Sequence, residues 1–359
     1  MNYAFTNGKI LDGSRDMQVQ TGLCILVKNG KIHDIVSDTA DLSGYTKIDL
    51  KGHYILPGLI NMHVHLAGSG KPQKKQRDNE KLVNTIMSTS LTRAIAYRMV
   101  ADFAKDELLS GVTTIRTVGG LGDFDTRLRD EIKTGTKIGP RILASNQGIS
   151  VPGGHMAGSV AVAASSIPDA LSHLKKSEQQ KVDLIKLMIT AGVLDAKEKG
   201  VPGELKMPPE MVRAVCEKAH ADGYLVVAHV ESPEGVRVAL ENGVDSIEHG
   251  AKLTDEMVKL FKERGAFLCT TISPALPYAL FDRSITNTTK RSAELTDIDS
   301  ITGSIEKGKA ADLIVTAQNP LKDLKALRNL EMVISGGRFI EHPKIKKRKQ
   351  VEAELDKFL

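Results

Sequence analysis

Residues 55–65 read Ile-Leu-Pro-Gly-Leu-Ile-Asn-Met-His-Val-His, an apolar run that ends in two histidines separated by one residue. Side chains two positions apart in a β-strand point to the same face. If the run is a strand, the imidazoles of His63 and His65 project together from its end, within reach of one metal ion. Taken alone, the pair would favour two histidines that merely decorate a strand, because short His-x-His strings also arise by chance.

The chain around this run alternates short apolar segments with helix-length stretches, a pattern typical of βα units and a parallel sheet. The predicted strands are Ile55–His63, Val112–Val118, Arg141–Gln147, Leu184–Ile189, Leu225–Val230, Ser246–His249 and Phe267–Ile272. Apolar residues at three- and four-residue spacing predict amphipathic helices over Glu210–Ala221 and Asp255–Arg264. This order of strands and helices indicates an α/β fold, a (β/α)8 TIM barrel, although a doubly wound open sheet would give a similar order.

Both ends of the chain read as short strands. Asn7-Gly8 and Asn29-Gly30 carry the signal of two-residue type I′ hairpin turns, and residues 311–315 and 332–340 look like strands too. We therefore expect a small β-sandwich built from both termini, with the central domain inserted between its two parts. The predicted divisions are 1–56 (sandwich, first part), 57–303 (barrel), 304–343 (sandwich, second part) and 344–359 (C-terminal surface helix).

Composition excludes several classes of protein. The chain has 359 residues, of which 41% are hydrophobic and 26% charged, as in an ordinary globular protein rather than a disordered one. The net charge of +5 comes largely from two local clusters, at 71–77 and 344–349, so we expect no nucleic-acid partner. No uncharged apolar run approaches the roughly 20 residues that cross a bilayer, and no signal-peptide pattern opens the chain, which predicts a cytoplasmic protein without a membrane partner.

The three cysteines, Cys24, Cys216 and Cys269, lie far apart in apolar segments. This placement favours small core residues in a reducing compartment over a disulfide framework.

Lys186 lies inside the predicted strand 184–189, where neighbouring residues are apolar. Parallel strands of a barrel are buried on both faces, so an ammonium group there needs a specific reason. One reason is carbamylation, because a desolvated lysine with a lowered pKa can add carbon dioxide and become an anion that bridges two metals. The alternative is an ion pair with a nearby carboxylate such as Asp183.

Two further histidines end predicted strands: His229 closes 225–229 and His249 closes 246–249. Four histidines on three strands and a buried lysine on a fourth would converge at the carboxyl ends of the strands. That is where the active sites of TIM barrels lie.

These residues and their surroundings resemble the amidohydrolase superfamily, in the branch of imidazolonepropionase-related and Xaa-Pro dipeptidase-like (prolidase-like) metal-dependent enzymes. The similarity runs nearly end to end. Its most specific segments are 56–65 and 303–313, the latter reading Gly-Ser-Ile-Glu-Lys-Gly-Lys-Ala-Ala-Asp-Leu.

The resemblance implies a site with two divalent metal ions, of which zinc is the usual one. It places His63 and His65 on one ion, His229 and His249 on the other, and Lys186, carboxylated by carbon dioxide, between them. Lys186 and His249 are the residues of this set to which we also assign catalysis. The implied reaction is hydrolysis of an amide C–N bond by metal-activated water, and relatives commonly assemble as homo-oligomers.

The substrate class rests on weaker signals. Residues 150–155, Ser-Val-Pro-Gly-Gly-His, resemble a Gly-Gly-His element of the dipeptidase-like branch, in which His155 would hydrogen-bond a substrate carbonyl or carboxylate. The alternative is a turn with an exposed histidine. Met156 stands where that branch commonly has glycine, and Glu231 where an aromatic residue often stands.

The favoured substrates are dipeptides or N-acyl amino acids with a free carboxylate. Three alternatives stay open: a cyclic amidohydrolase acting on ring amides or imidazolones, a non-catalytic metal-binding relative, and an aldolase-type barrel that uses Lys186 as a Schiff base. The last is disfavoured because the strand-end histidines would then have no role.

One element of the family pattern is not found. The eighth strand, with the aspartate that shuttles a proton, is expected between Thr286 and Lys290, where the chain passes directly to a segment that resembles the last barrel helix. Asp282, Asp297 and Asp299 follow no strand-like run, so none is assigned its role. We favour the explanation that the molecule has residues here that the sequence lacks, because both flanks match the family. A genuine deletion and a contribution from a neighbouring subunit are the alternatives.

Overall fold

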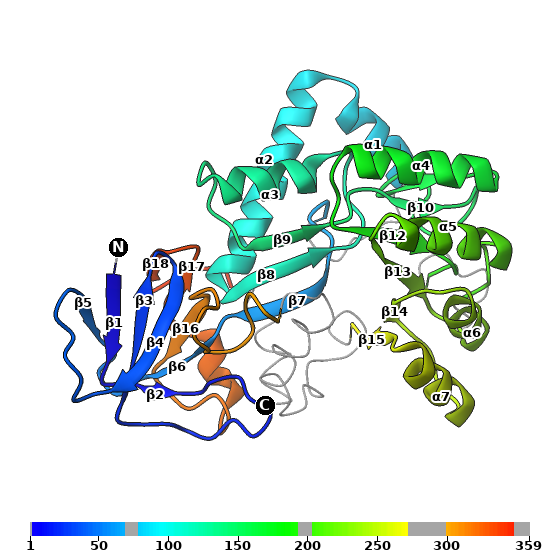
Figure 1. Cartoon of the computed structure of the whole chain (residues 1–359). Coiled ribbons are helices and arrows are strands. Elements are labelled where there is room, and N and C mark those ends of the chain that lie inside the picture. Colours follow the sequence, from blue (N-terminus) through cyan, green and yellow to red (C-terminus); the bar gives the residue numbers. More distant parts are fainter. Residues whose placement is uncertain (1, 69–77, 193–202, 272–298, 348–359) are drawn as a thin grey trace.

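The computed structural model describes residues 2–68, 78–192, 203–271 and 299–347 (Figure 1). Within them the predicted strand 55–63 is two strands, β6 (Tyr54–Pro57) and β7 (Leu59–Val64), which belong to different sheets. The chain passes between the sheets at Gly58, where a Cβ atom would lie 2.2 Å from Oγ1 of Thr113. Glycine is required here because no larger residue fits so close to the neighbouring strand.

The central region contains parallel sheets, as predicted. One sheet has the order β7-β8-β9, and the other has the order β11-β10-β12-β13-β14-β15. Their strands are β8 (Val112–Thr117), β9 (Arg141–Ala144), β10 (Gly148–Ser150), β11 (Ala161–Ala163), β12 (Leu184–Met188), β13 (Leu225–Val230), β14 (Ser246–His249) and β15 (Phe267–Cys269). The predicted strand 141–147 stops at Ala144, and Asn146 beyond it adopts a left-handed φ of 53°. The amide of Asp183 donates to the carbonyl of Ala144 at 2.8 Å, which links the end of β9 in one sheet to the residue before β12 in the other.

The described strands form an open parallel array, because β15 and β7 are not paired with each other. The place of the predicted eighth strand, between 286 and 290, lies outside the described residues. The prediction of a parallel α/β region is thus confirmed, whereas closure into a barrel is not established by the described part of the chain.

Helices follow most of these strands, and Figure 1 shows them ranged beside the parallel strands. They are α1 (Asn79–Met87), α2 (Ser90–Leu109), α3 (Phe124–Lys133), α4 (Ile167–Gln179), α5 (Pro209–Ala221), α6 (Pro233–Glu241) and α7 (Asp255–Arg264). The two predicted helices are confirmed as α5 and α7. Thr254 caps α7 by accepting from the amide of Met257, and acidic residues occupy its first turn. Among the described residues, no helix combines the length and the apolar character that a membrane crossing needs.

The core of the central region lies between helices and strands. α5 buries Val212 and Val215 against strand residues such as Val226, Ala228 and Ile247, all of them fully or almost fully buried. Every residue of β12 is buried, which is the pattern of a strand covered on both faces.

Strands from both ends of the chain form two further sheets. The four-stranded sheet has the order β4-β3-β1-β5 and the five-stranded sheet β18-β17-β16-β6-β2. Their strands are β1 (Asn2–Thr6), β2 (Lys9–Ile10), β3 (Leu23–Lys28), β4 (Lys31–Ser37), β5 (Thr46–Asp49), β16 (Leu313–Thr316), β17 (Leu330–Ser335) and β18 (Arg338–Glu341). Phe5 and Ile25 of the first sheet share one apolar cluster with Ile55, Leu313 and Ile334 of the second.

The two Asn-Gly signals have different outcomes. Asn29 and Gly30 join β3 to β4 with φ values of 52° and 75°, as a type I′ hairpin turn requires. The hairpin prediction at Asn7-Gly8 is wrong, because β1 and β2 lie in different sheets and β2 runs parallel to β6. Residues 344–347 of the predicted terminal helix are not helical, and 348–359 lie outside the described residues.

Candidate metal centre

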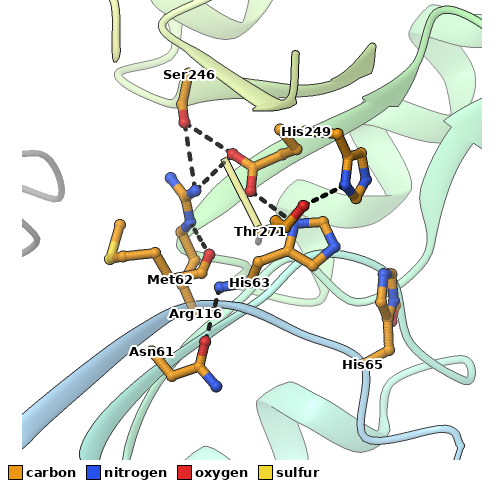
Figure 2. Close-up of polar contacts among 10 residues, drawn as sticks. Asn61, Met62, His63, His65, Arg116, Ser246, His249 and Thr271 are labelled. Carbon is orange, nitrogen blue, oxygen red and sulfur yellow. Dashed lines mark hydrogen bonds and ion pairs between the residues drawn. The ribbon is translucent and has the colours of Figure 1, made fainter. Parts of the chain in front are cut away.

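The structure brings the predicted histidines to one edge of the parallel strands. His63 lies on β7, His65 directly follows it, and His229 and His249 lie at the ends of β13 and β14. Ring centroids are 5.1 Å apart for His63 and His65, 4.7 Å for His63 and His249, and 4.7 Å for His229 and His249. Figure 2 shows His63, His65 and His249 gathered close together. His155 joins the group, because its partly buried ring stacks on that of His229 at 3.9 Å and 11°.

Hydrogen bonds fix the orientation of two of these rings. Nδ1 of His65 lies 3.0 Å from the carbonyl oxygen of Gly119, which can only accept. Nδ1 of His63 lies 2.7 Å from the carboxylate of Glu248. Each Nδ1 therefore carries the proton and each Nε2 keeps a lone pair, the form in which histidine binds a metal.

The third ring, that of His249, has its Nδ1 2.6 Å from Oγ1 of Thr271, which leaves Nε2 as its available nitrogen as well. Nε2 of His229 is buried and has no hydrogen-bond partner within the described residues. Such an atom costs free energy unless a ligand satisfies it.

Burial keeps the histidines neutral. Burial, with a smaller contribution from His63 and Lys186, lowers the pKa of His65 to about 3 and that of His249 to about 3. Burial also moves the pKa of His229 well below its ordinary value. The pKa of His63 is lowered as well, because burial outweighs the opposing effect of Glu248. Neutral imidazoles are the form that binds cations.

Lys186 lies on β12 and is 2% exposed. Its Nζ is buried without a hydrogen-bond partner in the described parts of the chain. The expected competitor, an ion pair with Asp183, is not formed: that carboxylate accepts from Arg129 at 2.7 Å and from the amide of Ala144 at 2.8 Å. Burial lowers the pKa of Lys186 to about 8, which makes an uncharged amine accessible near neutral pH.

A buried ion pair that was not predicted from the sequence lies beside the histidines. Glu248 has no exposed surface. Its Oε1 accepts a hydrogen bond from Nη2 of Arg116 at 2.6 Å, and its other oxygen, Oε2, contacts His63. Arg116 also donates from Nε to the carbonyl of Met62 at 2.8 Å, and Ser246 donates to Glu248 at 2.8 Å. Burial alone would raise the pKa of Glu248, but Arg116 and His63 more than offset it and hold this pKa below its usual range.

A signal for this pair was present in the sequence. Arg116 and Glu248 are opposite charges inside two predicted strands, 112–118 and 246–249, and the burial argument that singled out Lys186 applies equally to them.

One carboxylate lies close to two of the rings. The ligating atoms of His229, Glu231 and His249 all lie within 4.8 Å of one another, so among the described residues these three form a group that could hold a metal ion. Asp282 and Asp297 lie outside the described residues, and Asp299 is in a turn at the start of the last described segment.

Comparison with known proteins agrees with this geometry. A model of the amidohydrolase family matches residues 54–284. Ochratoxinase from Aspergillus niger is 24% identical over 276 residues, covering 69% of this chain and 55% of the relative, so the chain spans about half the length of that curated relative. A segment of 112 residues is 36% identical to imidazolonepropionase from Klebsiella pneumoniae, covering 27% of each protein.

Solved structures are similar over nearly the whole chain. A protein of Bifidobacterium longum assigned as a prolidase has a TM-score of 0.82 and 29% identity, covering 99% of this chain and 98% of that one. A Xaa-Pro dipeptidase with bound methionine has a TM-score of 0.79 and 26% identity; the similarity covers 95% of this chain and 100% of that one.

The family match spans more than half of the chain and includes the strand ends that carry all four histidines and Lys186. The chain belongs to the amidohydrolase family.

Proposed function

We propose that the protein is a metal-dependent hydrolase of amide C–N bonds, with dipeptides or N-acyl amino acids as its favoured substrates. The observation that carries the proposal is the convergence of neutral imidazoles on one strand edge, beside a buried lysine whose Nζ has no partner in the described residues. The prolidase and dipeptidase named above support the substrate class.

The donor set fits two divalent metal ions. We assign His63 and His65 to one ion and His229 and His249 to the other, since the rings lie within 5.1 Å of their neighbours and the Nε2 atoms are available. Imidazole ligands suit zinc, which is the metal that we propose. When bound, such ions polarise a substrate carbonyl and make water a nucleophile near neutral pH.

We propose that Lys186 becomes a carbamate. The uncharged amine forms an N–C bond to the carbon of carbon dioxide and releases one proton, which leaves an anion with two oxygens. An anion at this depth would replace an unpartnered Nζ by a group able to bind both cations.

Other residues of the chain would position the reactants. Glu248, held by Arg116, keeps the proton of His63 on Nδ1 and so directs Nε2 away from the strand. His155, stacked on His229, is placed to donate to a carbonyl or carboxylate of the substrate.

The complete architecture is part of the proposal. We infer that the parallel strands belong to a (β/α)8 barrel and that the two terminal sheets form a β-sandwich, with divisions near residues 56, 303 and 343. The support is the family match and the strand-end position of the site. A cytoplasmic location is supported by three cysteines that are all free, and self-association by the family resemblance; light scattering on the purified protein tests the latter.

The proposal is tested by metal analysis of protein purified with bicarbonate, together with hydrolysis assays on a panel of dipeptides and N-acyl amino acids. We expect about two zinc ions per chain in the native protein, and a marked loss of metal in Lys186→Met but not in Lys175→Met, which removes an exposed lysine on α4.

Turnover of imidazolones or ring amides without turnover of dipeptides would favour a cyclic amidohydrolase, which the short imidazolonepropionase match also supports. Bound zinc with no turnover on any amide would favour a non-catalytic relative. Trapping of a substrate on Lys186 by borohydride would replace the hydrolase by Schiff-base chemistry.

A further inference from the structure

Glu231 occupies a fixed position at the edge of the site. It is the first residue after β13, and Ser232 beside it caps α6 by accepting from the amide of Gly235. The amide of Glu231 donates to Oγ1 of Thr190 at 3.0 Å, so a hydrogen bond ties this backbone to the chain that follows β12. The residue is only partly exposed, and its Oε2 is buried.

The carboxylate of Glu231 faces the same space as two rings. Its oxygen and the ring nitrogens of His229 and His249 lie within 4.8 Å of one another. Ligand atoms around a tetrahedral zinc ion lie about 3.3 Å apart, since each is about 2.0–2.2 Å from the metal. The group therefore needs a closure of at most about 1.5 Å, which small side-chain rotations supply.

An independent observation points to a ligand in this space. Nε2 of His229 is buried in a residue that is 3% exposed, and no group of the described residues satisfies it. A cation placed between the three residues would satisfy this nitrogen and would be met by a carboxylate. The two imidazoles are neutral, so a carboxylate beside them would neutralise part of the charge of a divalent ion.

We infer that Glu231 is a further protein ligand of the metal ion held by His229 and His249, in addition to the carbamate proposed on Lys186. The inference rests on the proposed function, because it concerns one of the two metal positions proposed above. It also gives a role to a carboxylate at a position where the resemblance led us to expect an aromatic residue.

The test compares Glu231→Gln with Glu234→Gln, since Glu234 is an exposed glutamate in the first turn of α6 and loses the same charge. Zinc affinity is measured by competition with a chromophoric chelator, and stoichiometry by elemental analysis. We expect Glu231→Gln to weaken the less tightly held zinc roughly tenfold to a hundredfold, and Glu234→Gln to leave both ions as in the wild type.

A second readout does not depend on activity. Cobalt(II) bound in place of zinc absorbs visible light in a way that reports its ligands, so the spectrum of the Glu231→Gln protein should differ from that of the wild type and of Glu234→Gln. Glu231→Asp, which keeps the charge on a shorter arm, should recover part of the affinity and shows whether loss in Glu231→Gln reflects coordination rather than misfolding.

Equal zinc affinity and identical cobalt spectra in Glu231→Gln and the wild type would overturn the inference and leave the proposed function standing. A changed KM for substrates with a free amine, without any change in metal binding, would also overturn it by making Glu231 a substrate-binding residue. A wild-type protein that binds no zinc or cobalt would overturn the proposed function itself.

Discussion

Removing one member of the buried pair Arg116–Glu248 should destabilise the protein strongly. Both side chains are almost completely inaccessible, and Nη2 of Arg116 lies 2.6 Å from the carboxylate of Glu248. In Glu248→Leu the guanidinium keeps, of its partners in the described parts of the chain, only the carbonyl of Met62 and the hydroxyl of Ser246, at 2.8 and 3.3 Å. Loss of one partner of a buried ion pair costs about 3–5 kcal/mol, a large share of the roughly 5–15 kcal/mol by which proteins are stable.

Urea unfolding of the metal-free protein measures this cost. The chain has no tryptophan, so circular dichroism is the suitable signal. We expect Arg116→Met and Glu248→Leu each to lower the free energy of unfolding by about 3–5 kcal/mol, and the double variant to lose clearly less than the sum, because it buries no unpaired charge.

The control for this cycle is Arg237→Met, which breaks the exposed pair Arg237–Glu241 on α6, with an N–O distance of 3.4 Å. Its cost should stay below about 1 kcal/mol. Single variants of the buried pair that unfold within 1 kcal/mol of the wild type would refute the reasoning, and so would a double variant whose loss equals the sum of the two.

Three further expectations follow from the site and the sequence. The pKa values of His65 and His249 fall from 6.5 to about 3 on folding, so the unfolded state binds more protons than the folded state between these values. The free energy of unfolding should therefore be highest above pH 6.5 and should fall on acidification by about 1.4 kcal/mol per pH unit for each histidine. Urea unfolding at pH 7.5, 6 and 5 measures this change. A flat profile over that range would contradict neutral, buried rings. Removal of metal with a chelator should lower the unfolding temperature, by an amount equivalent to about 2.7 kcal/mol for an ion present at 100 times its Kd, and zinc should restore it; unchanged melting curves would argue against bound metal. The intact mass should exceed 38.9 kDa if the molecule contains an eighth strand that the sequence lacks, whereas a mass of 38.9 kDa would make the deletion genuine.

The part of the site that the sequence predicts is the part carried by local pattern. The two-residue alternation of side chains in a strand predicts that His63 and His65 point the same way, and the charge inside an apolar run singles out Lys186. The structure places all three residues at the parallel strands. The same logic failed for the strand 55–63, because apolar character continues across Gly58 while the hydrogen-bonding partners change sheet.

The part that the sequence did not predict depends on contacts between distant segments. Arg116 and Glu248 are 132 positions apart, and the local sequence around each residue does not indicate which opposite charge will contact it in the folded protein. The Asn7-Gly8 prediction failed for a related reason, since the turn signal is local but the parallel pairing of β2 with β6 is not. The eighth strand stays a prediction, as it falls on residues 272–298.

The passage of the chain at Gly58 also constrains the order in which the protein can be completed during synthesis. β6, whose next residues lead to His63, pairs on one side with β2 and on the other with β16, so that Ile55 meets Val315. A nascent chain has therefore made every histidine of the site before the second neighbour of β6 leaves the ribosome. The sheet that holds β6 is therefore completed only after the C-terminal strands have been added, whereas β7, which bears His63, can pair with β8 as soon as residues 112–117 have been made.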